Sequence, residues 1–129
     1  MSVKPILLLG DPRLRMPGQP VESFGKLLHS LIEDLVHTMR AHGAHTLLVS
    51  GGFTYFTSRV ADDAGFDEHQ GNKLLDDGQT LTGLVAEPIL GREAKLQALM
   101  DARAQMKLTP EETLAIGDGA NDLDMIKKA

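Results

Sequence analysis

Three apolar runs of the sequence are each followed by a polar residue that could take part in chemistry. Asp11 follows the run at 5–9, Ser50 follows 45–49, and Asp118 follows 113–116. In open α/β sheets, ligands bind beyond the carboxyl ends of the strands. If the three runs are strands of one parallel sheet, Asp11, Ser50 and Asp118 can therefore meet in one crevice.

Glycines flank two of these residues and indicate what the crevice could bind. Ser50-Gly51-Gly52 stands at a predicted helix start and offers a hydroxyl and unhindered N–H groups at a positive helix end, which suits a phosphate. The stretch 117–122 places Asp118 and Asp122 around a tight turn, which suits a hard divalent cation such as magnesium.

The first half of the chain must position these residues by alternating strands and helices. The run at 5–9 predicts a strand buried on both faces. Apolar residues spaced three and four apart from Glu22 onward, including Leu31 and Leu35, predict an amphipathic helix that ends at Gly43. A buried strand at 45–49 and a helix from 50–53 to about residue 64 follow.

The second half predicts a hairpin, two helices and one more strand. Strand-like runs between 71 and 88 flank the turn signal at 76–79. A helix is expected from about 91 to 106, with its inward residues at Leu96, Leu99, Met100 and Ala104. A short turn at 110–111, a strand at 113–116 and a last helix running to the chain end complete the prediction. Strands separated by helices imply an α/β, Rossmann-like, mainly parallel sheet.

Composition narrows the classes of function. A chain of 129 residues that is 42% hydrophobic and 24% charged fits one compact domain. The absence of cysteine excludes disulfides, thiolate nucleophiles and metal sites built on sulfur. A net charge of −5 and few aromatic residues argue against nucleic-acid and anionic-membrane partners. No apolar run is long enough for a signal peptide or a membrane span, so we expect a cytoplasmic protein.

Four short segments of residues 43–129 stand out as motifs. They are Leu-Leu-Val-Ser-Gly-Gly-Phe-Thr at 47–54, Leu-Thr-Gly at 81–83, Gly-Arg-Glu-Ala-Lys at 91–95 and Gly-Asp-Gly-Ala-Asn-Asp at 117–122. Together they resemble the haloacid dehalogenase superfamily, and within it the phosphoserine phosphatases. The signatures stand in the family's order. The resemblance implies the family's Rossmann-like core and a phosphomonoesterase chemistry.

The resemblance also implies roles for particular residues. Ser50, Gly51, Lys95 and Asn121 would bind the phosphoryl group, with Lys95 offsetting its charge. Asp118 would be a magnesium ligand, and Asp122 would support the metal shell. Lys95 and Asp118 are thus the catalytic candidates. Phosphoryl transfer depends mostly on charge neutralisation and positioning, which this set would supply.

Three parts of the family pattern are missing from the sequence. The family's nucleophile motif, Asp-x-Asp followed by x and Thr or Ser, does not occur. The cap domain and the strand after the last motif are also absent, so we expect a truncated core. Asp11 could replace the nucleophile by its position, but Pro12 and Arg13 make an Asp-Pro turn the more favoured interpretation.

Residues 1–42 carry a different pattern, in the stretch 6–15, the Pro20-Val21 step and the predicted helix around 31–39. This pattern resembles the amino-terminal segment of peptide deformylases. Without cysteine the deformylase metal site cannot be assembled, so that activity is not expected. We interpret the chain as a chimera joined near residues 42 and 43 that folds as one compact domain. In this interpretation the strand at 5–9 takes the central place between 45–49 and 113–116.

Each candidate has a structural alternative. Ser50 could cap the following helix, Lys95 could be a solvated helix residue, and Asp118 and Asp122 could be turn and cap residues. Two functions remain open: a core that binds phosphate or a small phosphomonoester with little or no catalysis, and a non-enzymatic folded chimera without a ligand. Uncovered sheet edges lead us to expect a homodimer or larger, with exchanged elements as one route.

Overall fold

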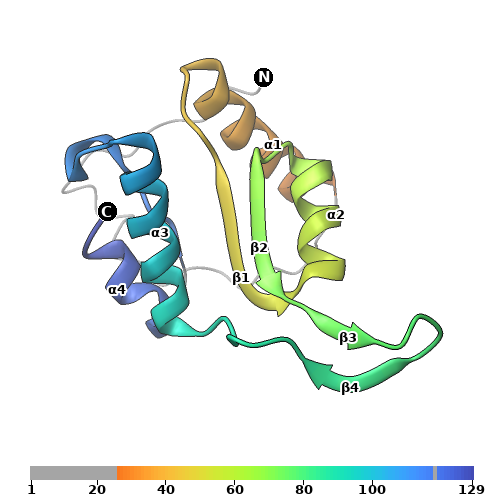
Figure 1. Cartoon of the computed structure of the whole chain (residues 1–129). Coiled ribbons are helices and arrows are strands. Elements are labelled where there is room, and N and C mark those ends of the chain that lie inside the picture. Colours follow the sequence, from red (N-terminus) through yellow and green to blue (C-terminus); the bar gives the residue numbers. More distant parts are fainter. Residues whose placement is uncertain (1–25, 118) are drawn as a thin grey trace.

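The computed structural model describes residues 26–117 and 119–129, and Figure 1 shows how their elements are arranged. These residues form four helices, four strands and two short 3-10 turns. In chain order they are α1 (Lys26–Ala41), β1 (Leu47–Phe53), α2 (Thr54–Ala64), β2 (Glu68–Asn72), β3 (Leu74–Asp76), β4 (Leu81–Val85), α3 (Arg92–Met106), η2 (Pro110–Glu112), η3 (Ala120–Asp122) and α4 (Leu123–Ile126).

A parallel pair of strands forms the centre of this part of the molecule. β1 pairs with β2, with Leu47 opposite Glu68 and Val49 opposite Gln70, and α2 connects the two strands. The α/β class and the parallel sheet are confirmed. The part of the chain that the structure describes contains no large cap domain. The predicted strand at 5–9, and with it the central place assigned to it, lies outside the described residues.

The predicted boundary between β1 and α2 is wrong. The strand continues through the serine and both glycines to Phe53, and α2 begins only at Thr54. The backbone of β2 comes very close to β1 along this irregular stretch. A Cβ on Gly71 of β2 would lie 2.9 Å from the carbonyl oxygen of Gly52, so glycine at position 71 permits the close approach. The pairing register shifts between Val49 and Phe53, as expected for a bulge.

β2 was not predicted. Its sequence, Glu-His-Gln-Gly-Asn, has no apolar run and does not alternate clearly. Among the described strands it pairs only with β1 and so lies at an edge, where polar side chains are tolerated. Backbone pairing with β1, rather than side-chain burial, makes this segment a strand.

The predicted hairpin is confirmed. β3 and β4 pair antiparallel and extend away from the central strands (Figure 1). In their turn, the Asp77 carboxylate accepts hydrogen bonds from the backbone N–H groups of Thr80 and Gln79, at 2.8 and 2.9 Å, and these bonds lower the pKa of Asp77 below its ordinary value. Gly78 has a φ of +89°, which glycine adopts without steric cost.

The buried apolar residues are small and few. α2 packs on both central strands and α1 packs on α2, while α3 lies on the other side of β1 (Figure 1). Among the described residues the buried apolar side chains are Val36, Ala61, Ala64 and Ala98. Two residues of the predicted apolar face of the first helix, Leu31 and Leu35, are exposed.

The predicted inward face of α3 is also wrong in part. Ala98 and Arg103 are buried, Leu96 and Leu99 are half-buried, and Met100 and Ala104 are exposed. α3 contacts β1 on one side and α4 on another, so its buried positions do not follow a single stripe. Arg103 is accommodated because its guanidinium donates to the carbonyl oxygen of Lys128 at 2.6 Å.

Residues 113–116 do not form the predicted strand with any described segment. Thr113 is extended, but Leu114 and Ile116 each remain 67% exposed and no described strand lies along them. The short turn before them is confirmed as η2. The last helix is present as α4 but ends at Ile126 instead of continuing to the chain end.

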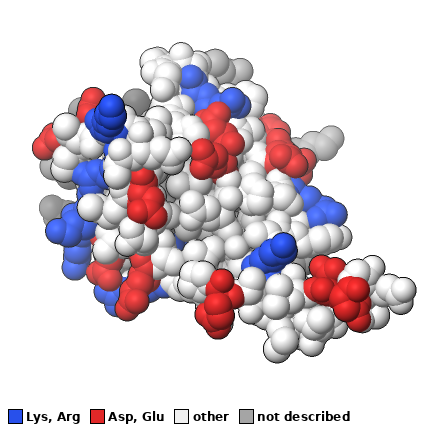
Figure 2. Space-filling view, viewed as in Figure 1, with Lys and Arg blue, Asp and Glu red and all other residues white. Residues whose placement is uncertain are grey.

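Acidic and basic side chains are interspersed on the face shown in Figure 2, so no extended field of one sign covers that face. None of the described helices combines the length and the apolar character that a membrane span requires.

Candidate functional site

Ser50 lies in β1 and is half-buried. Its hydroxyl oxygen accepts a hydrogen bond from the backbone N–H of Gly52 at 3.0 Å. The residue at the N-cap of α2 is Phe53, and α2 has no side-chain cap. The helix-cap alternative for Ser50 is therefore wrong, and its hydroxyl donates to no other residue of the described part of the chain.

Asn72 fixes this loop to the start of α3. It is 7% exposed, and its side-chain amide donates to the carbonyl oxygen of Gly51 at 2.8 Å. Its side-chain oxygen accepts from the backbone N–H of Leu90 at 2.7 Å. Leu90 is close enough to Gly51 that a Cβ there would lie 3.4 Å from the Leu90 carbonyl oxygen. One buried amide thus joins the carboxyl end of β1, the end of β2 and the segment that leads into α3.

Lys95, one turn into α3, forms a short ion pair with Asp122. Its ammonium nitrogen lies 2.5 Å from Asp122 Oδ1, and the two side chains are 13% and 5% exposed. The other carboxylate oxygen of Asp122 accepts from the backbone N–H of Gly119 at 3.1 Å. Asp122 therefore fixes both the lysine and the turn at 119–122.

The glycine before position 118 is required by this packing. A Cβ at Gly117 would overlap the Asp122 side chain close to its Cβ, whereas a Cβ at Gly119 would meet only the end of the exposed Asn121 side chain, which can move. Asp122 also donates its backbone N–H to the Gly119 carbonyl at 3.0 Å. The glycine-rich signature thus encodes a backbone folded closely around Asp122, while Asn121 is exposed.

A second pair fixes α3 to α4. Arg92, the first residue of α3, donates from Nε and Nη2 to the two oxygens of Asp124, at 2.6 and 2.8 Å. This bidentate contact raises the pKa of Arg92 and lowers the pKa of Asp124 relative to their ordinary values. The amino-terminal turn of α3 is therefore held by Asn72 and Leu90 on one side and by Asp122 and Asp124 on the other.

These contacts show which predicted residues the structure brings together. Lys95 and Asp122 are in contact, and Gly51 reaches the segment before α3 through Asn72. Asp11 and Asp118 lie outside the described residues. A hydroxyl on β1, the backbone of the exposed Gly51 and a lysine at a helix amino end are groups that suit a phosphate, whereas the Gly52 N–H is already bonded to Ser50.

The described residues alone do not fit a magnesium site. Within 26–117 and 119–129, no group of three or more His, Cys, Asp or Glu side chains could hold a metal ion. The Asp122 carboxylate already faces the Lys95 ammonium, whose charge would repel a divalent cation from that oxygen. Magnesium stays a prediction that depends on Asp118.

Two contacts that fix the candidate site were missed by sequence reasoning. Asn72 ends a polar stretch that carries no apolar pattern, and nothing in the sequence indicates its partners. Arg92 belongs to the recognised segment at 91–95, but its partner Asp124 is 32 residues away. No local spacing rule could have found either contact.

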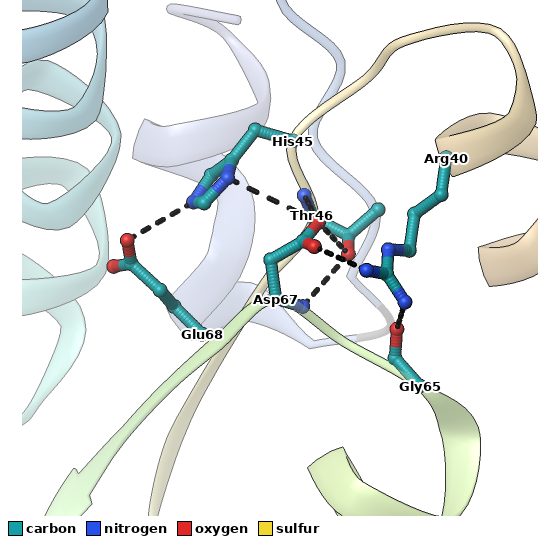
Figure 3. A network of polar contacts seen from close by, with 6 residues as sticks. All are labelled: Arg40, His45, Thr46, Gly65, Asp67 and Glu68. Atoms are coloured by element: carbon teal, nitrogen blue, oxygen red, sulfur yellow. Dashed lines mark hydrogen bonds and ion pairs between the residues drawn. The ribbon is translucent and has the colours of Figure 1, made fainter.

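The opposite end of the parallel strands carries a separate polar network (Figure 3). Asp67 accepts from the backbone N–H and the hydroxyl of Thr46, at 2.9 and 2.8 Å, and pairs with Arg40 at 2.8 Å. The Thr46 bonds and the Arg40 charge lower the pKa of Asp67 below its ordinary value. The network also includes His45, Gly65 and Glu68. It lies at the amino ends of the strands, so it fixes the sheet rather than the candidate site.

The chain matches a known protein family and curated proteins over most of its length. The family model of the haloacid dehalogenase-like hydrolases matches residues 15–127. A phosphoserine phosphatase of Albidiferax ferrireducens is 41% identical over 100 residues, which cover 74% of this chain and 42% of that protein. A phosphoserine phosphatase of Archaeoglobus fulgidus is 32% identical over 125 residues, which cover 92% of this chain and 36% of that protein.

Solved structures of phosphoserine phosphatases are also similar to this chain. The unliganded probable phosphoserine phosphatase from Vibrio cholerae aligns with a TM-score of 0.70 at 35% identity, over 74% of this chain and 30% of that one. A substrate-bound phosphoserine phosphatase complex aligns with a TM-score of 0.67 at 33% identity, over 75% of this chain and 46% of that one. The chain spans less than half the length of each of these relatives.

Proposed function

The chain belongs to the haloacid dehalogenase-like hydrolases, and we propose that it binds phosphate or a small phosphomonoester where the carboxyl end of β1 meets the start of α3. The observation that carries this proposal is the fixed placement of Lys95. Its ammonium is held by the buried Asp122, and Asn72 joins the Ser50–Gly51 loop to the segment before the same helix.

The proposed ligand contacts follow from the donors at this edge. The Ser50 hydroxyl and the Gly51 N–H bind phosphoryl oxygens, Lys95 offsets their charge, and the exposed Asn121 amide closes the other side. Asp122 is a positioning residue, because its oxygens are taken by Lys95 and Gly119. The relatives named as phosphoserine phosphatases support phosphoserine as the substrate class.

We propose that hydrolysis is slow or absent. No Asp-x-Asp-x-Thr or Asp-x-Asp-x-Ser motif occurs in the 129 residues, so the attacking carboxylate and the general acid of the family pattern are both missing. Asp11 is the carboxylate to test as a replacement nucleophile, and Asp118 as a magnesium ligand.

The origin of the amino-terminal segment is a separate proposal. Residues 1–42 derive from a deformylase-like segment joined to a phosphatase-like core at 43–129, and together they fold as one compact cytoplasmic domain. The family match begins at residue 15 and so overlaps this segment. The competing function is a folded chimera that binds no ligand, which the neutralisation of Lys95 by Asp122 favours.

A phosphorus-detected titration tests the proposed site. We expect phosphate and phosphoserine to bind to the full chain, and serine not to compete. Ser50→Ala, and the neutral pair Lys95→Met with Asp122→Asn, should each weaken binding at least about tenfold, because each removes a bond to a charged oxygen. Ser58→Ala in α2 and Lys107→Ala, at the end of α3 opposite Lys95, are the matched controls. Equal binding by the site variants and the controls would favour the chimera without a ligand.

Catalysis is tested separately with a chromogenic phosphomonoester and magnesium. We expect turnover at or near the background rate. Magnesium-dependent turnover that Asp118→Asn abolishes would contradict the proposed loss of catalysis, and loss of that turnover in Asp11→Asn would assign the nucleophile.

A further inference from the structure

Arg103 is a buried cation that has no carboxylate partner in the described part of the chain. It is 8% exposed, and no Asp or Glu of the described residues forms an ion pair with it. Glu111 senses its charge only in small part, because the pKa of Glu111 is lowered mainly by hydrogen bonds to its own backbone and to Thr109. A buried charge is costly unless an opposite charge pairs with it, so this guanidinium suits an anion.

Most of the hydrogen-bonding capacity of Arg103 is unused. A guanidinium has five N–H donors. Nη1 donates to the carbonyl oxygen of Lys128 at 2.6 Å, whereas Nε and Nη2 donate to no described residue. The planar fork of these donors matches the two oxygens of a carboxylate.

Arg103 lines an open cleft between the end of α3 and the residues that follow α4. The cleft has a volume of about 780 Å³, which is within the range of small-molecule sites. Lys107, Lys127 and Lys128 also line it, and none of its lining residues has an acidic side chain. Four basic side chains thus gather in one cleft of a chain whose net charge is −5, and an anion would offset their mutual repulsion.

The wall of the cleft is apolar. Met100, Leu108 and Pro110 lie between the basic side chains, and Met100 is 45% exposed. A ligand that consists only of charged groups would leave these side chains uncovered. A ligand with a short apolar chain behind its anionic group would cover them and remove apolar surface from water.

The cleft lies at the other end of α3 from the candidate phosphate site. Arg103 follows Lys95 by eight residues, which places it about 12 Å further along the helix axis. Lys127 and Lys128 come after α4, which lies beside α3 (Figure 1). Ser50 and the glycine loop do not line the cleft. The cleft is therefore a separate site.

We propose that the cleft between α3 and the residues after α4 binds a small amphiphilic carboxylate. The guanidinium of Arg103 binds the carboxylate, the exposed lysines add to the attraction, and the apolar chain packs against Met100 and Leu108. The inference does not depend on phosphate binding at Ser50 and Lys95, so the two proposals can fail separately.

Titrations of the full chain with hexanoate, 1-hexanol and acetate test the proposal, with amide chemical shifts as the measurement. Hexanoate carries both the charge and the apolar chain, whereas hexanol has only the chain and acetate only the charge. Hexanoate should bind at least about tenfold more tightly than either, because it combines a charge-assisted hydrogen bond with apolar burial. The saturating shifts should fall at 103–108 and 127–129. Inorganic phosphate, which has no apolar part, should not displace hexanoate.

Two variants of the cleft and one matched control assign the binding. Arg103→Met keeps a long side chain without the charge and should weaken hexanoate binding at least about tenfold. Lys107→Gln combined with Lys127→Gln changes only exposed side chains, so it keeps the fold, and should weaken binding at least about threefold because exposed charges are partly screened. Arg59→Gln combined with Lys73→Gln removes two exposed charges away from the cleft and should bind hexanoate like the parent chain.

Four results would overturn the proposal. Equal affinity for hexanoate and hexanol would show that the charge is not recognised, and displacement of hexanoate by inorganic phosphate would show that the apolar chain is not. Equal weakening in the two double variants would show that only the overall charge of the chain matters. Shifts confined to 50–52 and Lys95 would place the ligand at the candidate phosphate site.

Discussion

Replacing Asn72 should damage both the stability of the fold and the proposed site, because one side chain serves three backbone groups. In Asn72→Ala, the Gly51 carbonyl loses its donor at 2.8 Å and the Leu90 N–H loses its acceptor at 2.7 Å. Asn72 is 7% exposed, so water cannot easily replace either bond. The weaker contact of the same amide with the Leu90 carbonyl, at 3.4 Å, is lost as well.

The expected loss of unfolding free energy is about 2–4 kcal/mol, from two net hydrogen bonds of about 1 kcal/mol each and the cost of leaving buried partners unsatisfied. For a domain of this size, this corresponds to a fall in Tm of roughly 10 °C. Urea unfolding followed by circular dichroism measures the free energy, and calorimetry measures the Tm.

Gln97→Ala is the matched control. Gln97 also donates its side-chain amide, to Asp101 at 2.7 Å, but on the exposed surface of α3. Its loss should cost only about 0.2–0.5 kcal/mol. If the two variants had equal stability, the reasoning that Asn72 fixes the loop to α3 would be refuted.

Asn72→Asp adds a pH test. A carboxylate there can accept from the Leu90 N–H but cannot donate to the Gly51 carbonyl, whereas the protonated acid can donate. Burial raises the pKa of such a carboxyl above its unfolded value of about 3.9. The deficit relative to the parent chain should therefore be smallest below that value and grow as the pH rises. A deficit that does not vary with pH would contradict this account.

Three further predictions concern the ion pairs and the assembly. Asp122→Asn leaves the Lys95 ammonium without its carboxylate at a site where both side chains are largely buried, and should lower the free energy of unfolding by about 3–5 kcal/mol. Most of this loss should be recovered in the double variant with Lys95→Met. Urea unfolding that shows no such recovery would contradict the pairing. The Thr46 bonds are the main cause of the lowered pKa of Asp67 in the folded state. The ionised Asp67 therefore contributes its full stabilisation above the unfolded pKa of about 3.9, and this stabilisation is lost as the pH falls through the folded pKa. Asp67→Asn should accordingly flatten the acid limb of a plot of Tm against pH. Light scattering should show a dimer or larger species, because apolar side chains such as Tyr55 and Phe56 are exposed, and a monomer at high concentration would refute this.

Elements defined by local chemistry could be predicted from the sequence. The β3–β4 turn is encoded by Asp77 and Gly78, whose side-chain acceptor and positive φ act within four residues. The existence of α2 and α3 follows from patterns of similar range. Glycines lie near both ends of α2 and directly before α3, whereas the residue that follows α3 is Lys107. The order of strands and helices then gives the α/β class without any tertiary information.

Elements defined by distant partners could not be predicted in the same way. β2 is a strand because its backbone pairs with β1, although its side chains are polar. Residues 113–116 have the composition of a strand, yet lack a described neighbour to pair with. Composition therefore identifies a segment that can be a strand, while pairing decides whether it is one.

The candidate site shows the same division. The signatures identified Ser50, Lys95 and the turn at 117–122 because their residue types suit phosphate chemistry. They did not show that Asp122 would hold Lys95, or that Asn72 would hold the loop, since both contacts join residues more than 17 positions apart. The family resemblance indicated which residues suit phosphate chemistry, whereas only the structure shows which residues hold Lys95 and the glycine loop in place.

The contacts that hold the candidate site are mainly polar, and this determines how phosphate binding should respond to urea. The described buried apolar residues are one valine and three alanines, too few to fix the glycine loop and α3 by packing alone. Asn72, Asp122 and the Arg92–Asp124 pair fix them instead. Hydrogen bonds and ion pairs depend steeply on geometry, whereas apolar burial does not. Phosphate binding should therefore be lost at a lower urea concentration than helical circular dichroism, and coincident transitions would show that the site and the fold share one cooperative unit.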